Sequence, residues 1–517
     1  MPRPSTRRLL SWLLFTVLVG LGLVFYLRAV TAMWQHNPLL TGESKSYDQT
    51  FYMEHAAGIA LGMDKDDFPR SRMPLYPWLL HFFFEKELYD TKTLYERYMR
   101  FNVVVSIAAL LGAFEIMRRS GLGARAAGGI TLMTALHVHI YKAVLFQPEL
   151  AFFTLYFLCF VLMWKSLQGR SWKWLLATGV CAGITHLMKG SALPMFFGFG
   201  LLLGCRQVWE WWHRRRDPDK PGLVRQAVPV AAFAGGFLLI TGVFLFNSWK
   251  HYGSPFYDAN SRYYFWAENS GEMAALQGTK MAIIKPQVTK EQLSHPQLMK
   301  YLPIWAKDPA VARQIVRKAR AGQTVMLEGR YDILPGRRNY FRDHTLADAW
   351  QRIWDGLTGE HGILLHNFRH PNGYGIYVVL FGSMALAALL LAFLWDPRGI
   401  WSAVRRNLFP ILFAGGSIIG CMLLYAWWAP VSNRNRFVLT QFLPVIFSLS
   451  VVLRACLLRL PVRLPLPWPR VAGGGVVQIT LWGIFVATLW MLVIDEADER
   501  IPELINRPHI GHRNISQ

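Results

Sequence analysis

The chain has 517 residues, of which 53% are hydrophobic, and its formal net charge is +23. So apolar a composition excludes a typical soluble protein, and apolar runs of about 20 residues recur, each long enough to cross a hydrocarbon core of roughly 30 Å. Continuous apolar runs, without period-two alternation, predict an all-α polytopic membrane protein. We attribute the positive charge to short cytoplasmic loops, and we expect no nucleic-acid partner.

Eleven apolar runs are predicted to be transmembrane helices. They cover residues 9–30, 98–118, 125–146, 149–167, 172–189, 191–206, 227–247, 374–395, 408–428, 436–456 and 472–494. With the N-terminus in the cytoplasm, every short inside loop carries Lys or Arg, as the positive-inside rule requires. An odd number of spans then places the C-terminal tail outside.

Two outside segments are long. The first covers residues 31–97 and contains an apolar stretch, 74–84, that is broken by two prolines and too short to span, which indicates an interfacial helix. The second shows amphipathic spacing over 345–354 and is predicted to be a small, mainly helical insertion. The predicted parts of the chain are the N-terminal module, the insertion, the C-terminal spans and the tail: 1–247, 248–373, 374–494 and 495–517.

A polar segment in the first outside loop contains Asp48, Tyr52 and His55. Asp48 is either a solvated loop residue or helix N-cap, or a carboxylate that deprotonates an acceptor hydroxyl. Tyr52 lies four residues on and would share a helix face with Asp48. His55 could assist the chemistry or bind a cation, although a surface position is the simpler interpretation.

A second acid, Glu149, opens the fourth apolar run after a short outside turn. It is either a favourable charge at a helix N-terminus or part of a pocket shared with Asp48, which lies on the same side of the membrane. His137 and His139 approach the same turn. Two histidines without a placed carboxylate are a weak metal signal.

Basic residues on the predicted outside face are candidates for binding an anion. Lys189, which follows His186, lies between two apolar runs and is either a snorkelling anchor or a phosphate ligand. Arg434 and Arg436 occupy a short outside loop, where few arginines are expected, and therefore need a lipid phosphate or a carboxylate as partner. Arg262 is a less specific candidate of the same kind.

The sequence contains no Walker A, GxGxxG or GxSxG motif in a suitable context. The predicted inside loops are also too short to form a domain that binds a nucleotide sugar. An energy-rich donor must therefore reach the outside face in a lipid-linked form.

The motif Asp48-Gln49-x-x-Tyr52-x-x-x-Ala56, followed by Pro74-Leu75-Tyr76-Pro77-Trp78-Leu79, resembles the first outer loop of GT-C-type glycosyltransferases of family 39. This family includes protein O-mannosyltransferases and the bacterial enzymes that add aminoarabinose to lipid A. Further matches, in the same order along the chain, are Arg97-x-x-Arg100-x-Asn102, Glu149-Leu150-Ala151-Phe152-Phe153, Leu187-Met188-Lys189-Gly190 and Arg436-Phe437-x-x-x-x-x-Pro444. They cover most of residues 1–450.

The resemblance implies a GT-C-type bundle in the bacterial inner membrane. It also implies an inverting transfer from a polyprenyl-phosphate sugar to a hydroxyl or phosphate of a lipid, glycan or protein acceptor in the periplasm. Asp48 would match the general base and Glu149 the second acidic position. The residues implied in donor-phosphate binding are Arg72, Lys189, Arg262, Arg434 and Arg436, and those in the pocket are Tyr52, His55 and His186. Some relatives hold a divalent metal, so Mg or Mn is a candidate cofactor, with Asp48, Glu149 and His139 as candidate ligands.

The sequence departs from its relatives at two positions. Many of them have Glu where this chain has Gln49, and Lys where it has Met73, with Arg72 one residue earlier. Arg72 is therefore the expected replacement for that lysine.

Two alternatives remain open at this point. A transporter or flippase of a lipid-linked or anionic substrate would carry charges in mid-span, whereas most charges here lie at span ends. Glu115 is an exception, although it lies close to Arg118 and Arg119. The other alternative is a non-catalytic scaffold that binds a partner through the 248–373 segment.

Overall fold

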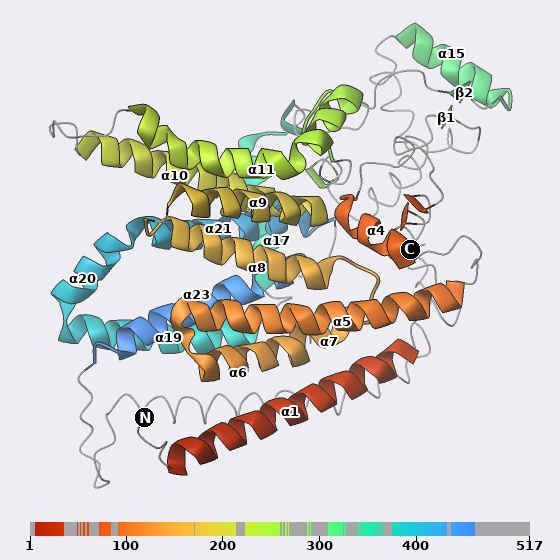
Figure 1. The fold of residues 1–517 in the computed structure, drawn as a ribbon. Helices are drawn as coiled ribbons and strands as arrows, with labels where there is room; N and C mark the ends of the chain where they lie inside the picture. The colour runs from red at the N-terminus through yellow and green to blue at the C-terminus, as the bar shows by residue number, and fades with distance from the viewer. Residues whose placement is uncertain are drawn as a thin grey trace.

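The computed structural model describes the backbone of 6–35, 49, 52, 55–56, 59–60, 72–83, 91–169, 171–213, 223–258, 261, 264–265, 267, 287–288, 290, 309–323, 325–326, 340–342, 344–359, 362–364, 375–431 and 436–460. Within these residues most of the chain forms helices that run side by side in one bundle (Figure 1).

The first half of the chain supplies most of the bundle. Its helices are α1 (Thr6–Gln35), α4 (Leu75–Leu80), α5 (Thr91–Met117), α6 (Ala124–Thr134), α7 (Ile140–Lys142), α8 (Glu149–Ser166), α9 (Trp172–Met188), α10 (Leu193–His213) and α11 (Leu223–Tyr252). Shorter turns join them: η2 (His81–Phe83), η3 (Arg118–Leu122), η4 (Ala135–His139) and η5 (Gly190–Ala192).

The second half contributes further helices and one small sheet. The helices are α15 (Pro309–Arg320), α17 (Leu346–Thr358), α19 (Gly375–Trp395), α20 (Pro397–Arg406), α21 (Leu408–Trp428), α22 (Arg436–Leu439) and α23 (Phe442–Leu457). Strands β1 (Gln287–Val288) and β2 (Val325–Met326) pair antiparallel and lie beside α15, away from the bundle (Figure 1). The predicted insertion therefore contains strands as well as helices.

Six helical segments in the described chain are long and apolar enough to cross a membrane. They are Glu96–Leu122, Glu149–Ser166, Gly190–His213, Ala227–Lys250, Gly375–Trp395 and Leu408–Trp428. Val19–Trp34 and Phe442–Leu457 are shorter apolar helices. The protein is thus a polytopic helical membrane protein, but the number of eleven spans is not confirmed. The run predicted over 125–146 is divided into α6, η4 and α7, and the run over 472–494 lies outside the described residues.

Helix α8 lies at the centre of the bundle. It contacts α5, α9, α21 and α23, and Figure 1 shows it between α9 and α5. Its aromatic side chains Phe152, Tyr156, Phe157 and Phe160 are fully buried. Because side chains from four neighbouring helices enclose α8, the first residue of this helix, Glu149, is held in a fixed place in the bundle.

Helices α9 and α11 pack closely because glycines line their contact. A Cβ added to Gly236 would lie 2.2 Å from the carbonyl oxygen of Leu176, and one added to Gly179 would lie 2.1 Å from that of Phe233. Small residues let helix backbones approach in this way in membranes. The close contact positions the end of α9, where Lys189 follows.

Replacing Gly236 by Ala should therefore destabilise the protein. The added methyl group would force α9 and α11 apart, and overpacking of this kind costs about 1–3 kcal/mol. The neighbouring Gly235 is the matched control, since a Cβ there meets nothing within 4 Å. We expect a lower midpoint of thermal unfolding for G236A than for G235A in the same detergent. Equal midpoints would contradict the close helix contact.

Candidate active site

A buried ion pair joins the start of α8 to the end of α9. The Nζ of Lys189 donates to Oε1 of Glu149 at 2.9 Å, with 16% of the Lys189 side chain and 3% of the Glu149 side chain exposed. Lys189 directly follows α9, where the backbone becomes extended (φ −159°, ψ 124°). Its ammonium group is thus directed to Glu149, and it also lies 5.5 Å from the ring centroid of Phe152.

Helix α4 brings Tyr76 next to this ion pair. Its hydroxyl donates to Oδ1 of Asn102 at 3.3 Å, and Nδ2 of Asn102 donates to the carbonyl oxygen of Leu145 at 2.8 Å. Burial raises the pKa of Tyr76 well above its usual value, and electrostatic repulsion of a Tyr76 phenolate by the nearby Tyr52 and Glu149 groups raises it further. Tyr76 therefore stays protonated and keeps its hydroxyl as a donor beside Glu149.

Arg72 and Tyr52, both predicted site residues, lie on the same side of α4. The Tyr52 ring packs edge-on against Tyr76, with 5.2 Å between centroids, and the guanidinium of Arg72 lies 5.7 Å from the Tyr52 centroid. His55, another predicted pocket residue, follows Tyr52 by three positions and is also buried. Aromatic contacts thus join this part of the first loop to Tyr76 of α4.

A hydrogen bond to Gln49 attaches the same loop to the turn before α8. Its side-chain Oε1 accepts a hydrogen bond from the backbone N–H of Phe146 at 2.8 Å, and the residue is 1% exposed. Phe146 lies three residues before Glu149. The acceptor oxygen used here is one that a glutamate would also supply, which gives a physical reason why Gln49 can replace the Glu of related sequences.

Asp258 is a site residue that the sequence did not single out. A Cβ added to Gly190 would lie 2.7 Å from Cε of Met73 and 3.7 Å from Oδ2 of Asp258, so all three residues meet beside Lys189. Asp258 also accepts a hydrogen bond from Oγ of Ser261 at 2.8 Å. The only signal in the sequence was its position four residues before Arg262.

Two predicted histidines occupy apolar or hydroxyl-rich surroundings rather than the ion pair. The ring of His186 lies among Phe237, Phe244 and Phe256, with centroid distances of 5.8, 6.3 and 6.0 Å. His139, in the π-helical turn η4, shares a 3.1 Å hydrogen bond with Ser106. The charged groups described around Glu149 are therefore carboxylates and basic side chains, not these two histidines.

Other predicted residues lie outside what the structure describes. These are Asp48, Arg262 and Arg434, together with the side chain of Arg436, whose backbone begins α22. Their roles stay predictions.

The described candidate metal ligands do not form a metal site. Among the residues that the structure describes, no group of three or more His, Cys, Asp or Glu side chains could hold an ion. Glu149 is paired with the ammonium of Lys189, which repels a divalent cation, and His139 is hydrogen-bonded to Ser106. The metal stays a prediction.

Comparison with known families identifies the domain that carries the ion pair. Residues 75–254 match the family of dolichyl-phosphate-mannose-protein mannosyltransferases. This stretch is a domain of that family. The mannosyltransferase-family domain runs from the start of α4 to just beyond α11 and includes both Glu149 and Lys189. No curated protein and no solved structure matches the chain.

The family resemblance predicted from the sequence is thereby confirmed. The matched family is one of glycosyltransferases, so the match indicates a membrane glycosyltransferase. The matched stretch begins after Asp48 and Arg72, so the family comparison does not test either residue.

Proposed function

We propose that this protein transfers a sugar from a polyprenyl-phosphate donor to an acceptor hydroxyl, with inversion, on the periplasmic face of a bacterial inner membrane. The observation that carries the proposal is the buried Glu149–Lys189 ion pair within the mannosyltransferase-family domain. A buried charge pair at a helix end is costly to desolvate, and such groups in membrane proteins mark functional sites.

Lys189 would stabilise the leaving phosphate. As the bond between C1 of the sugar and the phosphate oxygen breaks, negative charge grows on that oxygen, and a preorganised cation lowers the energy of this transition state. Glu149 orients the ammonium of Lys189 while the site is empty. Arg72, whose guanidinium lies 5.7 Å from the Tyr52 ring centroid, is proposed to add a second positive charge. Arg262, Arg434 and Arg436 are proposed for the same task.

Asp48 would act as the general base. Adjacent Cα atoms are about 3.8 Å apart, and Asp48 is bonded to Gln49, whose side chain is fixed to the turn before Glu149. Asp48 would take the proton of the acceptor hydroxyl while the acceptor oxygen attacks C1 on the face opposite the phosphate. One C–O bond forms, the C1–O bond to phosphate breaks, and the configuration at C1 inverts.

The proposed topology places the basic helix ends in the cytoplasm. Arg118 and Arg119 follow α5, and Lys165 lies in the last turn of α8, opposite the Glu149 end. We therefore propose that the N-terminus is cytoplasmic and the C-terminus periplasmic. In this arrangement 1–247 forms the catalytic module and 248–373 faces the acceptor.

A reconstituted transfer assay tests the proposed function. Purified protein in liposomes would receive a labelled sugar either on polyprenyl phosphate, as mannose or aminoarabinose, or on a nucleotide, with a cell-envelope extract as acceptor. We expect label to reach the acceptor only from the lipid-linked form and with inverted configuration. Label that crosses the bilayer on an unmodified lipid would instead establish the flippase alternative.

The Gln49 contact yields a further prediction. Gln49→Leu removes the acceptor for the Phe146 N–H and should lower turnover, because the loop that carries Asp48 loses its attachment. Gln49→Glu retains an acceptor oxygen and should restore most of the activity. A wild-type rate for Q49L, measured in the same liposome assay, would show that the contact does not position the loop.

A further inference from the structure

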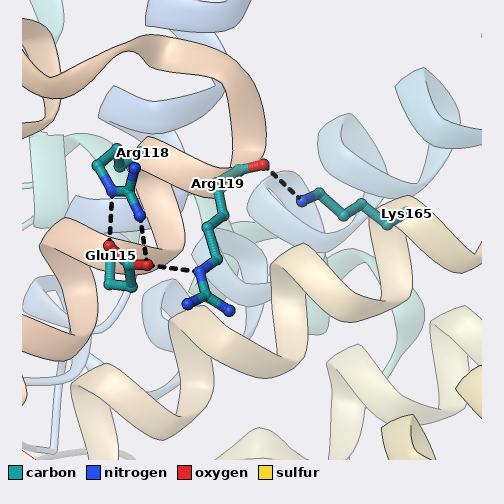
Figure 2. Close-up of polar contacts among 4 residues, drawn as sticks. All are labelled: Glu115, Arg118, Arg119 and Lys165. Carbon is teal, nitrogen blue, oxygen red and sulfur yellow. Dashed lines mark hydrogen bonds and ion pairs between the residues drawn. The ribbon is translucent and has the colours of Figure 1, made fainter.

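A second charged cluster lies at the opposite end of α8, where α5 passes into the π-helical turn η3 (Figure 2). Arg118 binds the carboxylate of Glu115 with two hydrogen bonds, from Nε and Nη2, each of 2.7 Å. Arg119 binds the same carboxylate through Nε at 2.5 Å. Glu115 is thus held between two guanidinium groups.

Two further cations reach the same turn from other helices. The Nζ of Lys165, in α8, donates to the backbone carbonyl of Arg119 at 3.3 Å, as Figure 2 shows. A Cβ added to Gly121 would lie 3.3 Å from Nη1 of Arg454, in α23. Gly121 has φ 98°, a left-handed conformation that glycine adopts without strain and that shapes the turn.

The cluster carries more positive than negative charge. Among the described residues of this cluster, four cations (Arg118, Arg119, Lys165 and Arg454) stand against the carboxylate of Glu115, which leaves three positive charges. The Arg119 side chain is 74% exposed, and Arg454 is also exposed. Within the described part of the chain, the guanidinium of Arg454 and the Nη groups of Arg119 have no hydrogen-bond or ion-pair partner.

An apolar stripe on α5 leads away from this cluster. Val104 and Leu111, fourteen and seven residues before Arg118, are each 63% exposed. Residues seven apart share a helix face, so the stripe lies below the charged turn on one side of α5. A ligand with an anionic head and an acyl chain matches both features, whereas a free phosphate matches only the first.

We propose that this cluster binds the headgroup of an anionic glycerophospholipid in the leaflet opposite the active site. The phosphate would lie between Arg119 and Arg454, and an acyl chain would follow Val104 and Leu111. Basic pockets between membrane helices on the cytoplasmic side bind anionic lipid headgroups in this manner. The site joins α5, α8 and α23, so its lipid would brace these helices at one end.

Lipid titration followed by native mass spectrometry tests this site. The full-length protein would be delipidated in detergent and titrated with phosphatidylglycerol or phosphatidylcholine. Each basic group near an anionic headgroup contributes about 1 kcal/mol, so R119A/R454A should bind phosphatidylglycerol about 30-fold more weakly and R454Q about fivefold more weakly. Arg454 has an exposed side chain, so R454Q should fold normally even where the double variant does not.

The charge-matched control is R405A/R406A, which removes two exposed arginines from α20 at the same end of the bundle. It should bind phosphatidylglycerol like the wild type, and phosphatidylcholine should bind equally weakly to every variant. Equal losses of phosphatidylglycerol affinity in R119A/R454A and the control would show that the cluster acts only as general surface charge, and would overturn the proposal. Inorganic phosphate that displaced the lipid at similar concentration would identify a free-anion site and overturn the proposal.

Discussion

Asp48→Asn should abolish sugar transfer while the protein stays folded. Asparagine keeps the size of the side chain but cannot accept a proton from the acceptor hydroxyl at neutral pH. General bases contribute about 10²- to 10⁴-fold to rate, so the variant should lose at least that much in kcat. The measurement is single-turnover transfer from a labelled polyprenyl-phosphate sugar.

Donor binding provides the control for this variant. D48N should bind the donor with wild-type affinity, because the proposed phosphate ligands are unchanged, and its thermal midpoint should match the wild type. Retained turnover would remove Asp48 from the mechanism. Lost donor binding with a lowered midpoint would instead assign Asp48 a structural role, which is the helix-cap interpretation of the sequence.

Lys189→Met should impair both activity and stability. Methionine keeps the length and apolar character of the stem but removes the ammonium that pairs with the buried carboxylate of Glu149, and breaking a buried pair in this way costs about 3–5 kcal/mol. Losing the cation that faces the leaving phosphate should lower kcat by a further factor of about 10²–10³. Thermal unfolding and transfer assays measure the two effects separately.

The double variant Glu149→Gln/Lys189→Met separates stability from catalysis. The double variant no longer buries the Glu149 carboxylate without the Lys189 ammonium. It should therefore unfold closer to the wild-type temperature than K189M does. It should remain inactive, because no ammonium is left to face the phosphate. Recovery of activity in the double variant would show that the ion pair serves only the fold.

The sequence predicted the helices well and their contacts poorly. The runs 149–167, 172–189 and 408–428 coincide closely with α8, α9 and α21, because helix length and hydropathy are local properties of the chain. The run 125–146 was predicted as one apolar helix, and no local signal reveals the π-helical turn that the structure places at 135–139 between α6 and α7.

Which charged residues of the site pair with each other could be seen only in the structure. From the sequence, Lys189 could equally be a snorkelling anchor or a phosphate ligand, and the choice depends on Glu149, 40 residues earlier. Likewise, the bond from Phe146 to Gln49 joins residues 97 apart, and Asp258 enters the site only through the bend after α11. Hydrophobic periodicity contains no information about such pairings, because they depend on how α4, α8, α9 and α11 meet.

The most direct test of the account is a cryo-EM map of the D48N variant with a polyprenyl-phosphate sugar bound. An inactive variant should retain its donor unhydrolysed. We predict that the donor phosphate lies within about 4 Å of the Nζ of Lys189, an ion-pair distance, with C1 of the sugar facing residue 48. A donor phosphate bound away from Lys189, with residue 48 facing bulk water, would contradict the proposed active site.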